Sequence, residues 1–94
     1  MSEPLSQTEI ESALAELADW EFSEDALVKR FTFPDFMAAM AFMSEAAPAI
    51  DALNHHPEWA NVYNRVDVRL TSHDAGNRVT HADVTLARLL ERSA

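Results

Sequence analysis

Residues 51–64 read DALNHHPEWANVYN, and the rest of the chain is organised around this stretch. Pro57 has no backbone N–H to continue a helix, so the helix that precedes it ends there. The residues after Pro57 predict a strand, and Asn64 suits the tight turn of a hairpin. His55 and His56 stand side by side at this junction. The stretch therefore predicts a helix end and a strand start, with two imidazoles between them.

Two adjacent histidines allow two interpretations. They could form a polar helix C-terminus, where a cationic imidazole suits the helix dipole. They could also belong to an active site, because imidazole gives and takes protons readily at neutral pH. A third histidine, His73, ends a strand-like run that follows this stretch, and this recurrence favours the active site. Asp51 lies four residues before His55, so in a helical turn its carboxylate is expected to orient that imidazole.

The residues downstream predict a strand and a last helix. Residues 65–73 alternate between apolar and polar side chains, as a strand does when one face lies in the core. The polar face of this strand could meet solvent, another subunit or a site. Thr80 and Asp83 have the spacing of a capping box and open the last helix. This gives Asp83 a sufficient structural role.

The residues upstream predict a helix and a first hairpin. Ser6 and Glu9 form a capping box at the start of a helix over residues 5–18. Residues 20–33 alternate on either side of a turn and predict the hairpin. Trp20, at its start, could plug the edge of the core or form a flat wall against a planar ligand.

Another helix is expected over residues 35–53, with Pro34 in its first turn. Its expected buried face steps by four and three residues and consists of Phe36, Met40, Met43, Ala47 and Ile50. Pro48 removes one backbone hydrogen bond from the helix interior. We therefore expect a kink or a break near Ala47.

The predicted elements follow the order αββαββα. The length of 94 residues suits a single domain over residues 1–94. Mixed helices and hairpins of this kind indicate an α+β fold. Because the core is small and the hairpins leave sheet edges unpaired, we expect a homo-oligomer.

Composition excludes several classes of function. The net charge of −9 argues against nucleic acid or an anionic membrane as partner, and is compatible with a neutral or cationic small molecule. The absence of cysteine excludes disulfides and thiolate metal sites. No two histidines have the i, i+3 or i, i+4 spacing of a metal site, so no metal is expected. No apolar run reaches the roughly 18 residues of a membrane span, and the acidic N-terminus lacks a signal-peptide pattern, so we expect a cytoplasmic protein.

Three segments resemble one family: NHHPEW at residues 54–59, NVYN at residues 61–64 and TSHD at residues 71–74. They are similar to the pterin-4a-carbinolamine dehydratases, and the similarity extends from Trp20 to Leu90. The resemblance implies a two-layer α+β fold, with helices packed on one face of a four-stranded antiparallel sheet. It also implies a homodimer or a homotetramer.

The resemblance further implies an activity. Family members remove water from the 4a-carbinolamine that an aromatic amino-acid hydroxylase leaves on a tetrahydropterin, and they yield quinonoid dihydropterin without a metal or an organic cofactor. The catalytic residues implied are His55, His56 and His73. Of these, His55 and His73 are expected to act as acid and base, and His56 to hold the pterin. The substrate-binding residues implied are Asp51, Trp20, Pro57, Trp59 and Asp83.

Two other functions fit the same fold. Some relatives are dimerisation partners of a transcription factor or assembly helpers, so a non-catalytic scaffold is one alternative. A pterin-binding protein without turnover is the other. The presence of all three histidines favours the enzyme.

Overall fold

The computed structural model describes residues 3–94 and contains the expected helices and strands in the expected order. They are α1 (Gln7–Ala15), β1 (Glu21–Ser23), β2 (Ala26–Thr32), α2 (Phe36–Leu53), β3 (Glu58–Val62), β4 (Arg65–Leu70), the short 3-10 helix η1 (His73–Ala75) and α3 (His81–Ser93). The α+β fold in the order αββαββα is confirmed, with η1 as an addition between β4 and α3.

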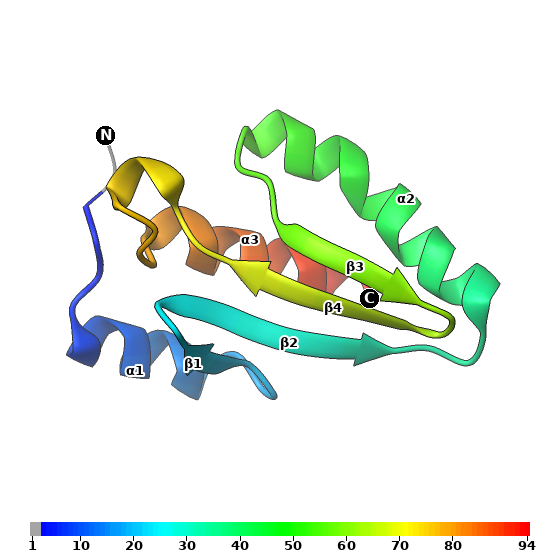
Figure 1. Ribbon diagram of the computed structural model, residues 1–94, viewed down its shortest axis with the longest axis horizontal. Coiled ribbons are helices and arrows are strands. Elements are labelled where there is room, and N and C mark those ends of the chain that lie inside the picture. Colours follow the sequence, from blue (N-terminus) through cyan, green and yellow to red (C-terminus); the bar gives the residue numbers. More distant parts are fainter. Residues whose placement is uncertain (1–2) are drawn as a thin grey trace.

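The four strands form one antiparallel sheet in the order β1-β2-β4-β3 (Figure 1). The central strand β4 alternates as predicted, because Val66, Val68 and Leu70 are buried on the face that meets the helices. The alternate residues of the same strand point to the open face. β4 therefore joins the helical layer to a polar surface, and its C-terminal end leads directly to His73.

Both predicted capping boxes are present. In α1, Ser6 Oγ accepts from the Glu9 N–H at 3.2 Å, and the Ser6 N–H donates to Glu9 Oε1 at 2.9 Å. In α3, the Thr80 N–H donates to Asp83 Oδ2 at 2.9 Å. The Leu5 N–H donates to the carbonyl of Val79 at 2.8 Å. This bond ties the segment before α1 to the loop between η1 and α3, and the two lie side by side in Figure 1.

The predicted buried face of α2 is right for Ile50 and Met43, which lie in or against the core, and wrong for Phe36 and Ala47. The side of the helix that enters the core consists of Ala39, Phe42, Ala46 and Ile50. Of the predicted set only Ile50 is fully buried, whereas Phe36 and Ala47 are exposed. The helix is apolar on almost every side, so periodicity alone could not single out one face. The small side chains of Ala39 and Ala46 let the helix approach the sheet closely.

Of the kink or break expected near Ala47, the break is absent, because α2 runs without interruption through Pro48. Pro48 costs the helix its bond to the carbonyl of Ser44. Both residues lie on the exposed side of α2, so water can satisfy that carbonyl. A proline on the solvent side therefore leaves the helix continuous.

By length and composition, α2 is apolar enough to cross a membrane, with a mean hydropathy of 1.3 over 18 residues. The expectation that no segment would reach this length rested on uninterrupted apolar runs, and α2 is interrupted by Glu45 and Asp51. One side of α2 packs in the core of the domain, as the core helices of many proteins do. Its other side leaves Met37 71% exposed, which is unusual for a large apolar residue.

Candidate active site

Three histidines from two parts of the chain line one cleft of about 360 Å³. His55 and His56 follow the C-terminal end of α2, and His73 begins η1 just beyond β4. The remaining lining residues are Asn54, Thr71 and Asp74. The fold thus brings together imidazoles that lie 17 or more positions apart in sequence. Groups that can give and take protons gather on a small polar cavity.

The position of the histidine pair depends on how α2 ends. Asn54 caps the helix in the left-handed conformation, with φ 56° and ψ 37°. Asparagine adopts this conformation more readily than most residues, so it suits the cap. The chain turns away there, and His55 is no longer on the helical face of Asp51. The predicted pairing of Asp51 with His55 is therefore wrong: Asp51 Oδ1 lies 3.2 Å from His56 Nε2 instead.

The partner of His55 is Asp83, a fully buried carboxylate in the first turn of α3. Its Oδ1 lies 2.6 Å from His55 Nε2. Its Oδ2 accepts from Ser72 Oγ at 2.8 Å, in addition to the Thr80 N–H. A carboxylate only accepts hydrogen bonds, so the proton of the His55 bond lies on Nε2. The other ring nitrogen, Nδ1, is left as the site that can exchange a proton.

His73 has a carboxylate partner as well, although a looser one. Glu58 Oε2 lies 3.5 Å from His73 Nε2, and Arg69 Nη1 donates to the same oxygen at 3.1 Å. Glu58 and Arg69 stand opposite each other on β3 and β4. Because His73 and Glu58 are both exposed, their contact holds the imidazole less firmly than the buried Asp83 holds His55.

The structure does not bring the predicted aromatic residues to the cleft. Trp20 is 5% exposed, packs edge-on against Phe31 and donates from its indole N–H to Glu91 Oε2 at 2.9 Å. Glu91 lies two turns beyond Asp83 on α3, so Trp20 plugs the core at the far end of that helix. Trp59 is partly buried against Phe42, and neither it nor Pro57 lines the cleft.

Sequence reasoning missed three residues around the histidines: Glu58, Ser72 and Thr80. Glu58 could have been found from the motif, because it stands between Pro57 and Trp59. Ser72 precedes His73 directly, but a lone serine carries no signal of its own. Thr80 was recognised only as a helix cap. Within residues 3–94 no group of three or more histidine or carboxylate side chains is placed to hold a metal ion.

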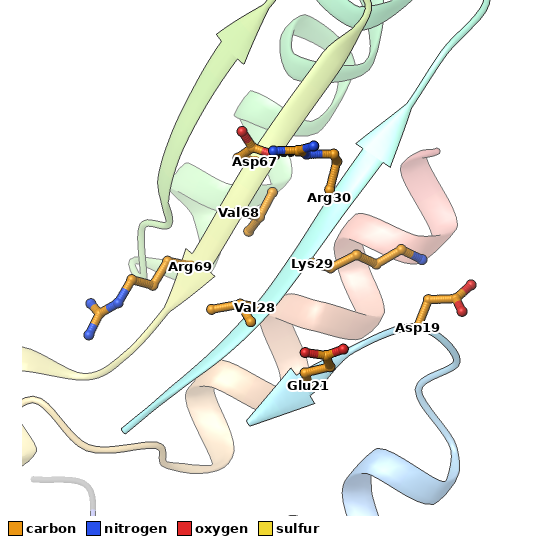
Figure 2. Close-up of a pocket in the computed structure, with 8 residues that line it drawn as sticks. All are labelled: Asp19, Glu21, Val28, Lys29, Arg30, Asp67, Val68 and Arg69. Carbon is orange, nitrogen blue, oxygen red and sulfur yellow. Dashed lines mark hydrogen bonds and ion pairs between the residues drawn. The ribbon is translucent and has the colours of Figure 1, made fainter. Parts of the chain in front are cut away.

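A larger hollow of about 530 Å³ lies on the open face of the sheet and shares no lining residue with the histidine cleft. Figure 2 shows the Arg30 guanidinium beside the Asp67 carboxylate, with Nε 2.6 Å from Oδ1. This bond holds the pKa of Asp67 below its usual value. The lining of the hollow holds one internal ion pair, Arg30 with Asp67, and no imidazole, whereas the smaller cleft gathers three imidazoles. We therefore take the smaller cleft as the candidate active site.

Comparison with known proteins gives a consistent result. The family model described as pterin 4 alpha carbinolamine dehydratase matches residues 3–93. A relative from Opitutus terrae named for the same family is 54% identical, over 94% of this chain and 91% of its own length. One from Rhizorhabdus wittichii is 49% identical, over 98% of this chain and 96% of its own length.

Among solved structures, the crystal structure of a transcriptional coactivator/pterin dehydratase from Brucella melitensis matches with a TM-score of 0.91. It is 41% identical, and the match covers 97% of this chain and 98% of that one. Sequence and fold agree over nearly the full length. The chain belongs to the pterin 4 alpha carbinolamine dehydratase family.

Proposed function

We propose that this protein is a hydro-lyase that removes water from a 4a-hydroxytetrahydropterin and releases quinonoid dihydropterin. The main support for this proposal is the cleft that three imidazoles line, one of them bonded to a buried carboxylate. Family membership supports the substrate class. The reaction would follow the aromatic amino-acid hydroxylase that produces the carbinolamine.

The chemistry requires one proton given and one removed. The departing 4a-hydroxyl needs an acid, and the N5–H needs a base, so that the C4a–O bond breaks as the C4a–N5 double bond forms. His55 and His73 reach the cleft from different elements, after α2 and after β4, and can act on different atoms of one small ligand. His55 presents its Nδ1, because Asp83 holds its Nε2.

His56 has a different proposed role. It is exposed, and Asp51, which contacts it, is exposed as well. A loosely held imidazole at the mouth of the cleft suits a hydrogen bond to the pterin edge better than proton transfer. We expect His56→Ala to raise KM more than it lowers kcat.

The test is to mix the purified protein with enzymatically generated carbinolamine and to follow quinonoid formation by absorbance. The uncatalysed dehydration is subtracted. Acceleration that is lost in His55→Ala but kept in His81→Ala supports the proposal, because His81 lies outside the cleft. No acceleration by the wild-type protein would defeat the dehydratase assignment and leave a pterin-binding protein or a scaffold.

We also propose that the protein is a homo-oligomer assembled through the exposed side of α2. Phe36 and Met37 expose large apolar surfaces there, and the helix presents mostly alanine and methionine around them. Such apolar surface usually marks a protein interface. Sedimentation should show a dimer or larger species that Met37→Glu dissociates, whereas Thr32→Glu on the open face of the sheet does not. A wild-type monomer at micromolar concentration would contradict this.

The same surface favours one second role. The Brucella melitensis relative is described as a transcriptional coactivator as well as a pterin dehydratase. In this second role, α2 binds a helix of another protein in place of its own copy, and the chain acts as a dimerisation scaffold. Met37→Glu would then abolish that binding and leave turnover per subunit unchanged.

A further inference from the structure

Ser72 lies at the centre of a buried network that the proposed mechanism does not yet use. It is 1% exposed and stands between β4 and η1, one residue before His73. Its Oγ lies 2.8 Å from Asp83 Oδ2 and 2.8 Å from Thr80 Oγ1. A longer contact of 3.5 Å runs to His55 Nε2. One hydroxyl thus touches both Asp83 and Thr80, the two fully buried polar residues nearest to it, and lies close to the imidazole of His55.

The direction of each hydrogen bond in this network follows from counting protons. Ser72 has one hydroxyl proton, and Asp83 can only accept, so Ser72 donates to Asp83. The Thr80 hydroxyl must then donate to Ser72, and Thr80 Oγ1 accepts from the Ala82 N–H at 3.2 Å. The chain of donors runs from Thr80 through Ser72 to Asp83, and the Asp83 carboxylate is left with Oδ1 for His55.

The backbone of Ser72 holds the other histidine. Its N–H donates to the Arg78 carbonyl at 2.9 Å, and its carbonyl accepts from the N–H groups of Ala75 and Asn77 at 3.2 and 3.0 Å. These bonds close the turn of η1, which begins at His73. The side chain of Ser72 is therefore tied to the support of His55, and its main chain to the support of His73.

We propose that Ser72 is a positioning residue for His55: its hydroxyl fixes the Asp83 carboxylate that holds His55. The catalytic meaning of this role rests on the proposed dehydratase function. Without the hydroxyl, Asp83 Oδ2 keeps only the Thr80 N–H, and the Thr80 hydroxyl loses its acceptor. The carboxylate is then free to rotate, and His55 is no longer restricted to the tautomer that carries its proton on Nε2.

The first experiment measures the tautomer of His55 directly. Nitrogen-15 NMR of the imidazole rings is recorded for the wild type, Ser72→Ala and Ser93→Ala at about pH 8, where unperturbed imidazoles are neutral. The ionisable groups around His55 are Asp83 from α3 and, lining the same cleft, His56, His73 and Asp74. Ser93→Ala is the matched control, because its hydroxyl bonds to Leu89 at the far end of α3.

We expect the wild type and Ser93→Ala to carry the His55 proton on Nε2, and Ser72→Ala to show a mixture of both tautomers. If Ser72→Ala keeps the wild-type spectrum of His55, the proposal is wrong. This measurement needs no substrate, so it decides the positioning role even if the dehydratase assay fails.

The second experiment uses turnover. Ser72→Ala should lower kcat by about 10- to 100-fold, as the loss of an orienting hydrogen-bond partner typically does, with KM within about twofold of the wild type. Thr80→Val should lower kcat in the same direction, and Thr80→Ser, which keeps the hydroxyl, should restore it. The Thr80 pair also provides the test if Ser72→Ala does not fold. Equal kcat values for Thr80→Val and Thr80→Ser would overturn the proposal.

Discussion

The two ends of α3 use the same contact for different purposes. Near its N-terminus, buried Asp83 accepts from the imidazole of His55; near its C-terminus, Glu91 accepts from the indole of Trp20. Each carboxylate has a further donor, Ser72 at one end and Lys29 at the other. In both cases a carboxylate on the helix fixes an aromatic ring from a distant part of the chain.

The rings differ in what they can do once fixed. An indole has a single nitrogen that donates and never accepts, so the Trp20 bond can only hold the core together. An imidazole has a second nitrogen, and His55, whose Nε2 is held by Asp83, lines a cleft. The contact alone therefore does not mark an active site. What distinguishes the N-terminal end of α3 is a titratable ring and the cavity in front of it.

The largest effect expected from this difference is on turnover. His55→Ala and His73→Ala should each lower kcat by about 10²- to 10⁴-fold with the fold intact, because general acid–base groups typically contribute that much. Trp20→Phe, at the other end of α3, should leave kcat unchanged. Stopped-flow measurement of quinonoid formation, together with circular dichroism, checks all three. Full activity in both histidine variants would show that the N-terminal end of α3 does not support catalysis.

A second, smaller effect is expected from the carboxylate itself. Asp83→Asn keeps the size of the side chain, but its amide cannot accept from His55, Ser72 and Thr80 together. We expect kcat to fall by about 10- to 100-fold. Steady-state kinetics of Asp83→Asn and Glu91→Gln, measured side by side, sharpen the comparison. Only Asp83→Asn, at the cleft end of α3, should lower kcat. The reverse order would show that the two ends were assigned the wrong way round.

At the C-terminal end of α3, the expected effect of a substitution is on the stability of the fold. Glu91→Gln leaves the mostly buried ammonium of Lys29 without its carboxylate and weakens the bond from Trp20. We expect a loss of about 1.5–3 kcal/mol in the free energy of unfolding, the usual range for a hydrogen bond to a charged group. Urea denaturation measures it. A variant as stable as the wild type would mean that the packing of Trp20 against Phe31 holds this end by itself.

The smallest effect is expected for a carboxylate at neither end of α3. Asp67 on the open face of the sheet has its pKa lowered, first by the hydrogen bond from Arg30. Because this pKa is lower in the folded state, the charged carboxylate stabilises the fold at pH values above the unfolded pKa of 3.8. That stabilisation is lost as the pH falls through the folded pKa. Asp67→Asn should cost less than about 1 kcal/mol near pH 7, because the pair is partly exposed.

Thermal unfolding of wild type and Asp67→Asn at several pH values checks this. The difference in Tm should shrink below about pH 4, where the carboxylate of the unfolded chain becomes protonated. Turnover should not change. A difference that grew in acid would mean that Asp67 destabilises the sheet in its charged form.

The sequence predicted what depends on neighbours in the chain. The capping boxes of Ser6 and Thr80 use partners three residues away, and both are present. The alternation of β4 needed only the period of a strand. The element order and the fold followed from these local patterns and from the resemblance.

The partners of the site residues could not be predicted in the same way. His55 and Asp83 are 28 positions apart, and Trp20 and Glu91 are 71 apart. These pairs form only when α3 packs across the sheet. The one local pairing that was predicted for a site histidine, Asp51 with His55, failed because a single left-handed residue, Asn54, turned the chain at that point. The prediction of the buried face of α2 failed in part because apolar residues lie on almost every side of this helix.

The hydrogen bond from Leu5 to Val79 has a practical consequence for anyone who prepares this protein. It places the segment before α1 beside the loop that connects His73 to α3 (Figure 1). A purification tag or fusion partner attached ahead of Leu5 is expected to crowd that loop and to lower the measured rate without touching a histidine. A tag after Ser93 leaves from the opposite end of α3, next to Glu91, and is the safer choice for kinetic work.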